Sequence, residues 1–347
     1  MGRVRFFDAT LRDGSHAIRH QLSLETIAAY CQAMDRAGMH TIVVGHGNGL
    51  GASSLQVGLS LHTDAEMLQT AAANLRNTKL GAYLIPGFGT IRDDIEPAIA
   101  AGTSLFKIGC HCTEADVTRQ HIEYLRKRDK EVYGVLMNYH MTSTERILEE
   151  AEKMQSYGAH GIILMDSAGA STPEMVKKTV SSLADRLHIA VGFHPHNNLG
   201  LAVANAYTAI EAGAGIIDGT LRGLGAGAGN CQLEALAALL FREGYELNID
   251  LFSWLDVSEQ IVKPLCPEDR ALTDLSIVSG MAGVFSGFKQ HVLNAAAEFH
   301  VDPRSIFTEL GRRKVVAGQE DVIVSVAQEL AHPADTDAES YFLSSLS

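Results

Sequence analysis

Two short segments, far apart in the sequence, carry side chains that could bind a metal ion together. The first contains Asp13 and follows an apolar run that predicts the first β-strand; the second carries His194 and His196 at the end of another predicted strand. Side chains at i and i+2 share a face of a strand, so both imidazoles can point to one place. One carboxylate and two imidazoles would leave coordination positions open for substrate and water. This arrangement is typical of a catalytic rather than a structural metal.

Arg12 and His16 flank the candidate carboxylate. On a regular strand Arg12 and Asp13 would diverge, but Gly14 allows the chain to bend so that both face the same region. His16 is a candidate general acid or base, because imidazole titrates near neutral pH. The alternatives are a surface ion pair at a turn and an exposed loop histidine. Amides often orient metal ligands, and the residues of this type beside the histidines are Asn197 and Asn198.

Repeated β-then-α units must position these side chains. Apolar, β-branched runs predict strands at 4–8, 41–45, 80–85, 104–109, 132–137, 161–165, 189–194 and 215–218. Amphipathic segments predict helices near 24–37, 64–76, 91–100, 114–128, 143–157, 173–185, 200–212 and 230–243. Eight evenly spaced units favour an α/β fold of the (β/α)8 TIM-barrel type over an open doubly wound sheet. Catalysis in such barrels occurs at the C-terminal ends of the strands, where both candidate segments lie.

Local signals mark several helix ends and a change of character late in the chain. Capping boxes are predicted at Thr63–Glu66 and Thr142–Glu145, and Thr172 precedes Pro173 at a first helical position. The sequence predicts a catalytic barrel over residues 1–250, a helical extension over 251–332 that closes over one barrel mouth, and a flexible tail over 333–347. Within the extension, helices are predicted from Phe285 to Phe299 and near 305–330.

Composition narrows the classes of function. The 347 residues carry a formal net charge of −13, which argues against nucleic acid and anionic membranes as partners. The N-terminus has no signal-peptide pattern, and the sequence contains no run of apolar residues long enough to span a membrane. The five cysteines lack the spacing of a disulfide framework or a zinc knuckle. We expect a soluble cytoplasmic protein with reduced thiols.

Two glycine-rich loops resemble phosphate-binding motifs only superficially. The first, over 47–52, is separated from its predicted helix by about a dozen residues, whereas a dinucleotide fingerprint runs directly into a helix. The second, over 223–230, precedes a helix where barrels often bind phosphate. We interpret the second loop as close backbone packing at the barrel rim, with phosphate or carboxylate recognition as the alternative.

Several longer motifs identify a family. The chain resembles the 4-hydroxy-2-oxovalerate aldolases, which belong to the DRE-TIM metallolyases, over nearly its whole length. The motifs that carry the resemblance are Thr10-Leu-Arg-Asp-Gly-Ser-His-Ala-Ile-Arg-His-Gln21, His111-Cys-Thr-Glu-Ala-Asp116, Val191-Gly-Phe-His-Pro-His-Asn-Asn-Leu-Gly200, the segment 221–230, and Gly318-Gln-Glu-Asp321.

The resemblance implies a class II pyruvate aldolase that uses Mn²⁺, or Mg²⁺ or Co²⁺, to cleave a 4-hydroxy-2-oxo acid into pyruvate and an aldehyde. It implies Asp13, His194 and His196 as metal ligands, Arg12 as the group that stabilises the enolate, and His16 as the proton shuttle. Ser167 and Phe285, with Arg12, would contact the substrate. An acylating aldehyde dehydrogenase is the implied partner, in a homo- or hetero-oligomer.

Three positions depart from the family pattern. The glutamate that would anchor the arginine is replaced by Val43, the aspartate of a His-Gly-Asp-Gly run by Asn48, and a tyrosine near the aldehyde by Phe285. Since the metal-binding pattern is intact, we expect the same chemistry on an altered substrate. The alternatives are a Claisen-type acyl-CoA condensing enzyme like the isopropylmalate synthases, and a degenerate barrel that serves as a scaffold for a partner.

Overall fold

The computed structural model describes residues 4–266 and 272–331, and it contains a closed barrel of eight parallel strands. The predicted tail over 333–347 lies outside the described residues. The first strand pairs in parallel with both the second and the last strand, which closes the barrel. The strands are β1 (Arg5–Asp8), β2 (Thr41–Val43), β3 (Lys79–Leu84), β4 (Leu105–His111), β5 (Glu131–Met137), β6 (Gly161–Asp166), β7 (Ala190–Pro195) and β8 (Ile216–Gly219). The predicted (β/α)8 barrel is therefore confirmed.

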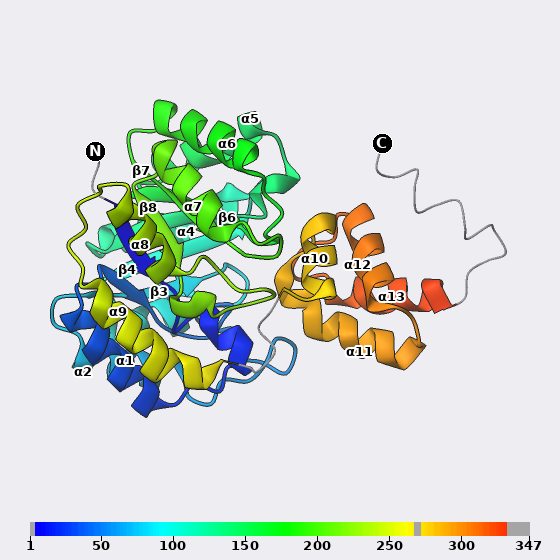
Figure 1. Cartoon of the computed structure of the whole chain (residues 1–347), viewed down its shortest axis with the longest axis horizontal. Helices are drawn as coiled ribbons and strands as arrows, with labels where there is room; N and C mark the ends of the chain where they lie inside the picture. The colour runs from blue at the N-terminus through cyan, green and yellow to red at the C-terminus, as the bar shows by residue number, and fades with distance from the viewer. Residues whose placement is uncertain (1–3, 267–271, 332–347) are drawn as a thin grey trace.

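Helices surround the barrel, as Figure 1 shows. They are α1 (Leu24–Arg36), α2 (Asp64–Asn74), α3 (Glu96–Ala100), α4 (Arg119–Lys127), α5 (Thr144–Ser156), α6 (Pro173–Arg186), α7 (Ala202–Glu211) and α8 (Leu233–Arg242). The capping box at Thr63 and the cap at Thr172 are confirmed. The box predicted at Thr142 is wrong, because the side chain of Ser143 caps α5 instead by accepting from the Arg146 amide.

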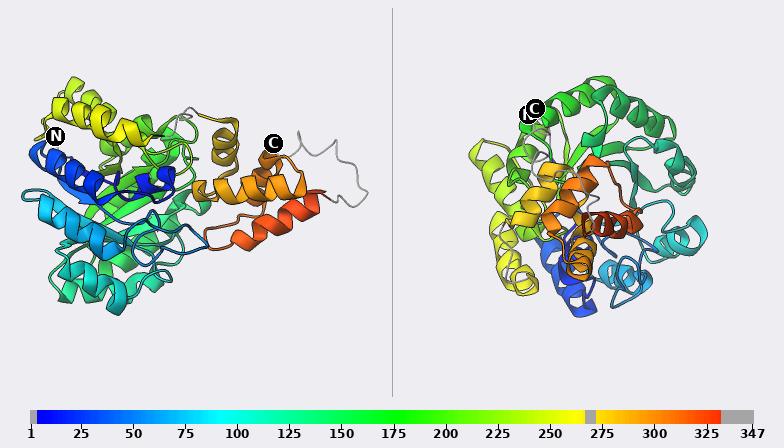
Figure 2. Two further views of the ribbon diagram at one scale, coloured as in Figure 1. Left: turned by 90° about the horizontal axis from the view of Figure 1, so that it is seen from below. Right: turned by 90° about the vertical axis from the view of Figure 1, so that its right-hand side faces the viewer.

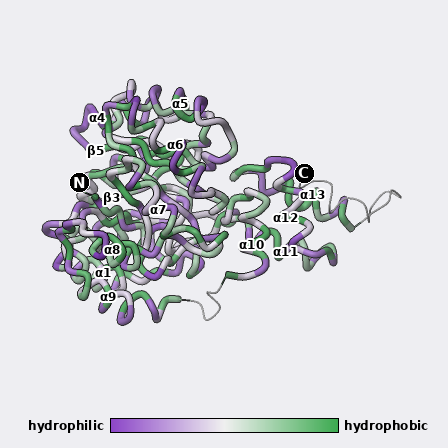
Figure 3. Tube along the Cα trace, turned by 45° about the horizontal axis from the view of Figure 1, so that its top comes forward, coloured by the Kyte–Doolittle hydropathy of each residue, from purple (hydrophilic) through white to green (hydrophobic). Residues whose placement is uncertain are grey.

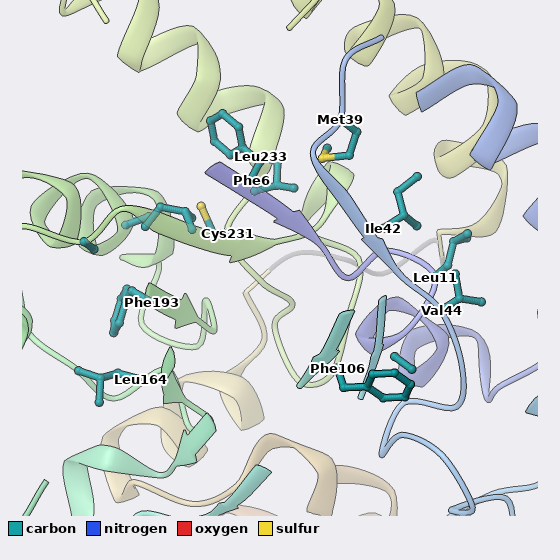
Figure 4. Close-up of a cluster of buried hydrophobic side chains, with 14 of the residues drawn as sticks. Phe6, Leu11, Met39, Ile42, Val44, Phe106, Leu164, Phe193, Cys231 and Leu233 are labelled. Atoms are coloured by element: carbon teal, nitrogen blue, oxygen red, sulfur yellow. The ribbon is translucent and has the colours of Figure 1, made fainter. Parts of the chain in front are cut away.

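Two apolar layers follow from the alternation of side chains along each strand. Outward-facing residues such as Phe6, Ile42 and Phe106 pack under the helices, as the close-up in Figure 4 shows. Inward-facing residues, including Phe7, Val43 and Tyr83, fill the barrel itself. In Figure 3 hydrophobic segments follow the strands, and hydrophilic segments gather on outer helices such as α4 and α5. The barrel is thus a packed core on which a site can be built at one end.

The C-terminal helices form a second apolar core. They are α10 (Asp274–Ala282), α11 (Lys289–Phe299), α12 (Pro303–Arg312) and α13 (Glu320–Ala331). The helix predicted near 305–330 is thus two helices, α12 and α13. Figure 2 shows these helices projecting from one end of the barrel and covering part of its mouth.

The helix that precedes them belongs with the barrel. In α9 (Leu251–Val257) the ring of Trp254 packs edge-on against Phe6 at 5.3 Å, and its Nε1 donates to the Ala37 carbonyl. We therefore propose that the chain divides between α9 and α10 rather than at residue 250. None of the helices in the described part of the chain is long and apolar enough to cross a membrane.

Candidate metal centre and active site

Asp13, His194 and His196 converge at the C-terminal end of the barrel. Asp13 opens a short 3₁₀ turn, η1 (Asp13–Ile18), that begins five residues after the last residue of β1, Asp8. His194 is the penultimate residue of β7, and His196 follows Pro195. One candidate ligand atom from each of the three side chains lies within 4.8 Å of the others, and all three side chains are buried. The predicted convergence is confirmed; the role of these residues as ligands stays a proposal.

The chemistry of these three groups fits a divalent ion. Nε2 of His194 and Nδ1 of His196 are buried without a hydrogen-bond partner among the described residues, whereas Nδ1 of His194 lies 3.2 Å from Asp218 Oδ1 without the alignment of a hydrogen bond. Burial lowers the pKa of His196, which leaves the ring neutral and able to bind a cation. Burial opposes ionisation of Asp13 as well, but the charge of Arg12 and the nearby histidines hold the pKa of this carboxyl well below its usual value. Buried nitrogen atoms without partners cost free energy unless an ion or ligand satisfies them.

The glycine-rich loop over 223–230 holds the Asp13 carboxylate. Asn230 Nδ2 and the Ala226 amide both donate to Asp13 Oδ2, at 2.6 and 3.3 Å. At Gly225 a Cβ atom would lie 2.4 Å from this oxygen, so only glycine allows the backbone so close. The interpretation of the loop as close backbone packing is confirmed. Asn230 was not predicted as a site residue, although it is the last residue of the motif 221–230.

Arg12 lies beside Asp13 and has spare donors. Its Nη1 donates to Asp13 Oδ1 and to the Gly47 carbonyl, both at 3.0 Å, and its guanidinium carbon lies 4.7 Å from the centre of the Tyr83 ring. Nε and Nη2 are buried without partners in the described structure. Val43 lies in the apolar interior layer with Tyr83 and offers no carboxylate. Two donors of Arg12 are thus available to an oxygen of a substrate.

His16 lies at the edge of the site in contact with two other histidines. Its ring is 5.0 Å from His20 and 6.4 Å from His46, measured between centroids. Burial, opposed by the Asp13 carboxylate, lowers the pKa of His16 to about 4, so the ring is neutral at pH 7 and able to accept a proton. At Gly47 a Cβ atom would collide with the His16 ring. The loop after β2 therefore fixes where His16 lies.

His20 and His46 stack face to face, with ring centroids 3.7 Å apart. His46 Nδ1 accepts from the Asn48 amide, and Nε2 lies 3.1 Å from the Gly58 carbonyl, which makes this ring a neutral donor and acceptor. Burial lowers the pKa of His46 to about 4 and that of His20 to about 3. The pair holds the loop after β2 against η1.

The structure does not bring the remaining predicted site residues to the metal cluster. The Asn197 side chain accepts from the Ala202 amide at the start of α7. Asn198 bonds to the Ser276 carbonyl, Ser279 and Ser286, so it ties the barrel to the C-terminal helices. These bonds differ from the predicted role of orienting the histidines.

Ser167 and Phe285 have structural contacts of their own. Ser167 Oγ accepts from the Asn138 amide, and its carbonyl accepts from the Ser286 amide. Phe285 is partly buried and packs edge-on against Phe288, with ring centroids 5.6 Å apart, at the core of the C-terminal helices. Their predicted contact with substrate stays a prediction.

Two charged residues inside the barrel were missed. Lys107 and Asp218 form an ion pair with both side chains completely buried, and Asp218 Oδ1 lies 3.2 Å from His194 Nδ1. The signal in the sequence was a single charge within each of two apolar strands, at 105–111 and 216–219. A charge in that position is almost never fully buried unless it is paired.

A cavity of about 710 Å³ opens beside His16, between the barrel mouth and the C-terminal helices. The barrel contributes His16, Arg19 and the loop 225–228, and the C-terminal helices contribute Thr273, Lys289 and His291. The cavity offers a route between the outside and the candidate base.

The chain matches two family models. Residues 3–261 match the HMGL-like family, and residues 271–332 match the DmpG-like communication domain. In fold, the chain is similar to the carboxyl transferase domain of Rhizobium etli pyruvate carboxylase with pyruvate, at 17% identity and a TM-score of 0.79, covering 95% of this chain and 61% of that one. This similarity to a solved structure shows the fold alone.

Curated relatives match along almost the full length. A 4-hydroxy-2-oxovalerate aldolase of Pectobacterium atrosepticum is 50% identical over 97% of this chain and 98% of its own. The 4-hydroxy-2-oxovalerate aldolase 2 of Salinispora arenicola is 52% identical over 96% of this chain and 95% of its own. The chain, an HMGL-like barrel followed by a communication domain, belongs to the 4-hydroxy-2-oxovalerate aldolase family.

Proposed function

We propose that this protein is a divalent-metal-dependent lyase that cleaves a 4-hydroxy-2-oxo acid into pyruvate and an aldehyde. The observation that carries the proposal is the buried set of Asp13, His194 and His196 next to an arginine with two unused donors. The near-full-length similarity to curated aldolases supports it. The same similarity favours cleavage over acyl-CoA condensation, and the intact ligand set argues against a metal-free scaffold.

The ion would be held by Asp13, His194 and His196. A divalent ion there acts as a Lewis acid toward the 2-oxo group of the substrate. We propose Mn²⁺ as the ion, with Mg²⁺ and Co²⁺ as the other candidates, because a carboxylate and two imidazoles suit several divalent ions.

Two side chains of this protein would transfer the proton and stabilise the enolate. His16, neutral at pH 7, would take the proton of the 4-hydroxyl as the C3–C4 bond breaks and the aldehyde forms. The bond's electron pair becomes the enolate of pyruvate, and Nε and Nη2 of Arg12 would donate to its oxygen. A proton then returns to C3, which completes pyruvate. Both groups are held in place before substrate binds, Arg12 by Gly47 and Tyr83 and His16 by its neighbouring histidines.

We also propose that the C-terminal helices bind an acylating aldehyde dehydrogenase, because they match a communication domain. The aldehyde would leave through the cavity beside His16. The oligomeric state and the cytoplasmic location stay predictions. Co-purification of the two proteins, followed by a comparison of aldehyde capture with and without a competing aldehyde trap, tests this partnership.

The deciding experiment measures pyruvate release with coupled lactate dehydrogenase. The metal-free protein is assayed on a panel of 4-hydroxy-2-oxo acids of increasing chain length, with and without added Mn²⁺. Release that depends on Mn²⁺ is expected, with the best substrate differing from 4-hydroxy-2-oxovalerate because Val43 and Asn48 depart from the family pattern. Cleavage of 4-hydroxy-2-oxovalerate as fast as by a standard family member would contradict the altered substrate. No release from any compound, with Mn²⁺ bound, would contradict the aldolase itself.

A further inference from the structure

A carboxylate inside the barrel bridges a lysine and one of the candidate metal ligands. Lys107 extends from β4 and Asp218 from β8, and their ion pair is completely buried. The other oxygen of Asp218 lies 3.2 Å from His194 Nδ1, and His194 is completely buried as well. The bridge thus runs across the barrel from an ammonium to an imidazole.

Stability alone is a poor explanation for this pair. Removing two charges from water costs free energy, and apolar residues of similar size often stabilise a core at least as well. The inward-facing neighbours of this pair along β4, β8 and β1 include the apolar side chains of Leu105, Ile216 and Phe7. A lysine and an aspartate here therefore require a role that apolar side chains would not provide.

The geometry selects one tautomer of His194. At 3.2 Å the contact is not aligned as a hydrogen bond in the described structure, but an ionised Asp218 can only accept one, so we infer that His194 Nδ1 carries the hydrogen. The lone pair is then on Nε2, which is buried and without a hydrogen-bond partner in the described structure. A carboxylate behind a ligating imidazole fixes both its tautomer and its ring orientation. Lys107 occupies the other oxygen of Asp218 and so keeps this carboxylate from turning.

We propose that Asp218, held by Lys107, is a positioning residue that presents His194 Nε2 to the metal ion. The proposal rests on the metal site of the proposed function. It makes the lysine and the aspartate, which are not among the candidate ligands, determinants of metal affinity.

The first test replaces Asp218 by asparagine. Lys107 attracts the amide oxygen, so the amide nitrogen faces His194 and forces the hydrogen onto Nε2. The Kd for Mn²⁺, measured by electron paramagnetic resonance of free Mn²⁺, is expected to rise about 10- to 100-fold in Asp218→Asn. In the metal-free parent, ¹⁵N NMR of the histidine rings should show His194 protonated on Nδ1, and in the variant on Nε2.

A matched control is Glu150→Gln. Glu150 is also completely buried and paired with cations, Arg146 and Lys153, but it lies on α5 outside the barrel. This variant should lose stability and keep the parent's Mn²⁺ affinity.

A double variant, Lys107→Met with Asp218→Asn, leaves no buried charge without a partner and remains available if the single variant does not fold. Its amide oxygen is free to turn to His194, so its Kd should return to within about threefold of the parent. If this double variant bound Mn²⁺ as weakly as Asp218→Asn, the reasoning from the tautomer would be wrong.

Other outcomes separate the two proposals. Parent protein with His194 protonated on Nε2, or an Asp218→Asn variant with the parent's Kd, would overturn the role of Asp218 alone. A parent protein that binds no Mn²⁺ would overturn the proposed function and, with it, the role in metal binding, while the NMR measurement would still report on the contact between Asp218 and His194.

Discussion

The site has two sides, which differ in how many hydrogen bonds hold their functional groups. The ligand side consists of Asp13, His194 and His196, and the arginine side consists of Arg12, Val43, Gly47 and Tyr83. The functional groups of the ligand side are held by more hydrogen bonds. On the ligand side, Asp13 accepts bonds from Arg12, Ala226 and Asn230. On the arginine side, Arg12 has the Gly47 carbonyl and an aromatic face, and two of its donors are unused.

This difference separates the two tasks of the site. The charged and polar groups around the candidate ligands do not involve position 43. Valine instead of glutamate at this position therefore leaves the candidate metal site intact. The arginine is held through Nη1 by the Asp13 carboxylate and the Gly47 carbonyl and rests on the Tyr83 ring, so Nε and Nη2 remain free for substrate. We therefore expect changes on the two sides to have separate effects, on metal affinity and on turnover.

The largest effect is expected on the ligand side, from Asp13→Asn. The variant loses the one anionic ligand, and its Kd for Mn²⁺ should rise on the order of 1,000-fold, with pyruvate release falling in parallel. Titration of the metal-free variant, with circular dichroism to verify folding, measures this. A Kd equal to that of the parent would show that the ion binds elsewhere.

On the arginine side, Arg12→Met should reduce kcat about 100- to 1,000-fold, because preorganised donors to the developing enolate are lost. Asp13 keeps its bonds from Asn230 and Ala226 and loses only the bond from Arg12, so the Kd for Mn²⁺ should change less than about 10-fold, far less than kcat. Steady-state kinetics and metal titration on the same preparation test both. Equal losses in kcat and in Mn²⁺ affinity would show that the ligand side and the arginine side do not act separately.

The stability of Val43→Glu tests whether Arg12 can pair with a carboxylate at position 43. A glutamate at 43 would extend from the layer that contains Tyr83, on whose ring Arg12 rests, and we expect its carboxylate to accept from the two unused donors. The control Val135→Glu places the same carboxylate in that layer on β5, across the barrel. The control should lose about 4 kcal/mol or more in free energy of unfolding, and Val43→Glu about half as much. Urea denaturation of both variants decides, and equal losses would show that Arg12 does not reach position 43.

The loop that carries Gly47 should make the arginine side sensitive to acid through the preceding residue, His46. The pKa of His46 is lowered to about 4 by burial, from an ordinary value of 6.5. Between these values the unfolded chain binds a proton that the folded chain does not, so stability falls as the pH falls. From pH 7 to pH 5 the loss from this residue should be about 2 kcal/mol. In His46→Gln this part of the loss should be absent from urea denaturation at the two pH values; the same pH dependence in both proteins would contradict the assignment.

The smallest effect is expected at Phe285, which belongs to neither side. Its ring packs against Phe288, and the cavity is lined by the adjacent Ser286 and Gly287. Phe285→Tyr should therefore change the ratio of kcat/KM for two aldehyde chain lengths less than about threefold. A residue that lined the aldehyde pocket could change this ratio more, because one methylene in a fitted pocket is worth about 1–3 kcal/mol. A larger change would show that the tyrosine of the family pattern does reach the aldehyde.

Patterns that depend on near neighbours were predictable. The alternation of apolar runs and amphipathic segments predicted eight strands and eight helices, because burial on one face imposes a period on the sequence. The pair His194 and His196 was predictable for the same reason, since residues two apart on a strand point the same way. Errors occurred where several polar residues compete for one local role, as at Thr142 and Ser143.

By itself, the sequence determined the barrel and the identity of the three candidate ligands, since periodicity and residue type are local properties. Only the tertiary structure decided the partners of these ligands: Lys107 and Asp218 lie on strands far apart in the chain, and Asn230 reaches Asp13 across 217 positions. It also decided that Asn198 binds the C-terminal helices. Barrel closure brings distant strands together, and the free energy of burying each polar atom depends on what then lies beside it.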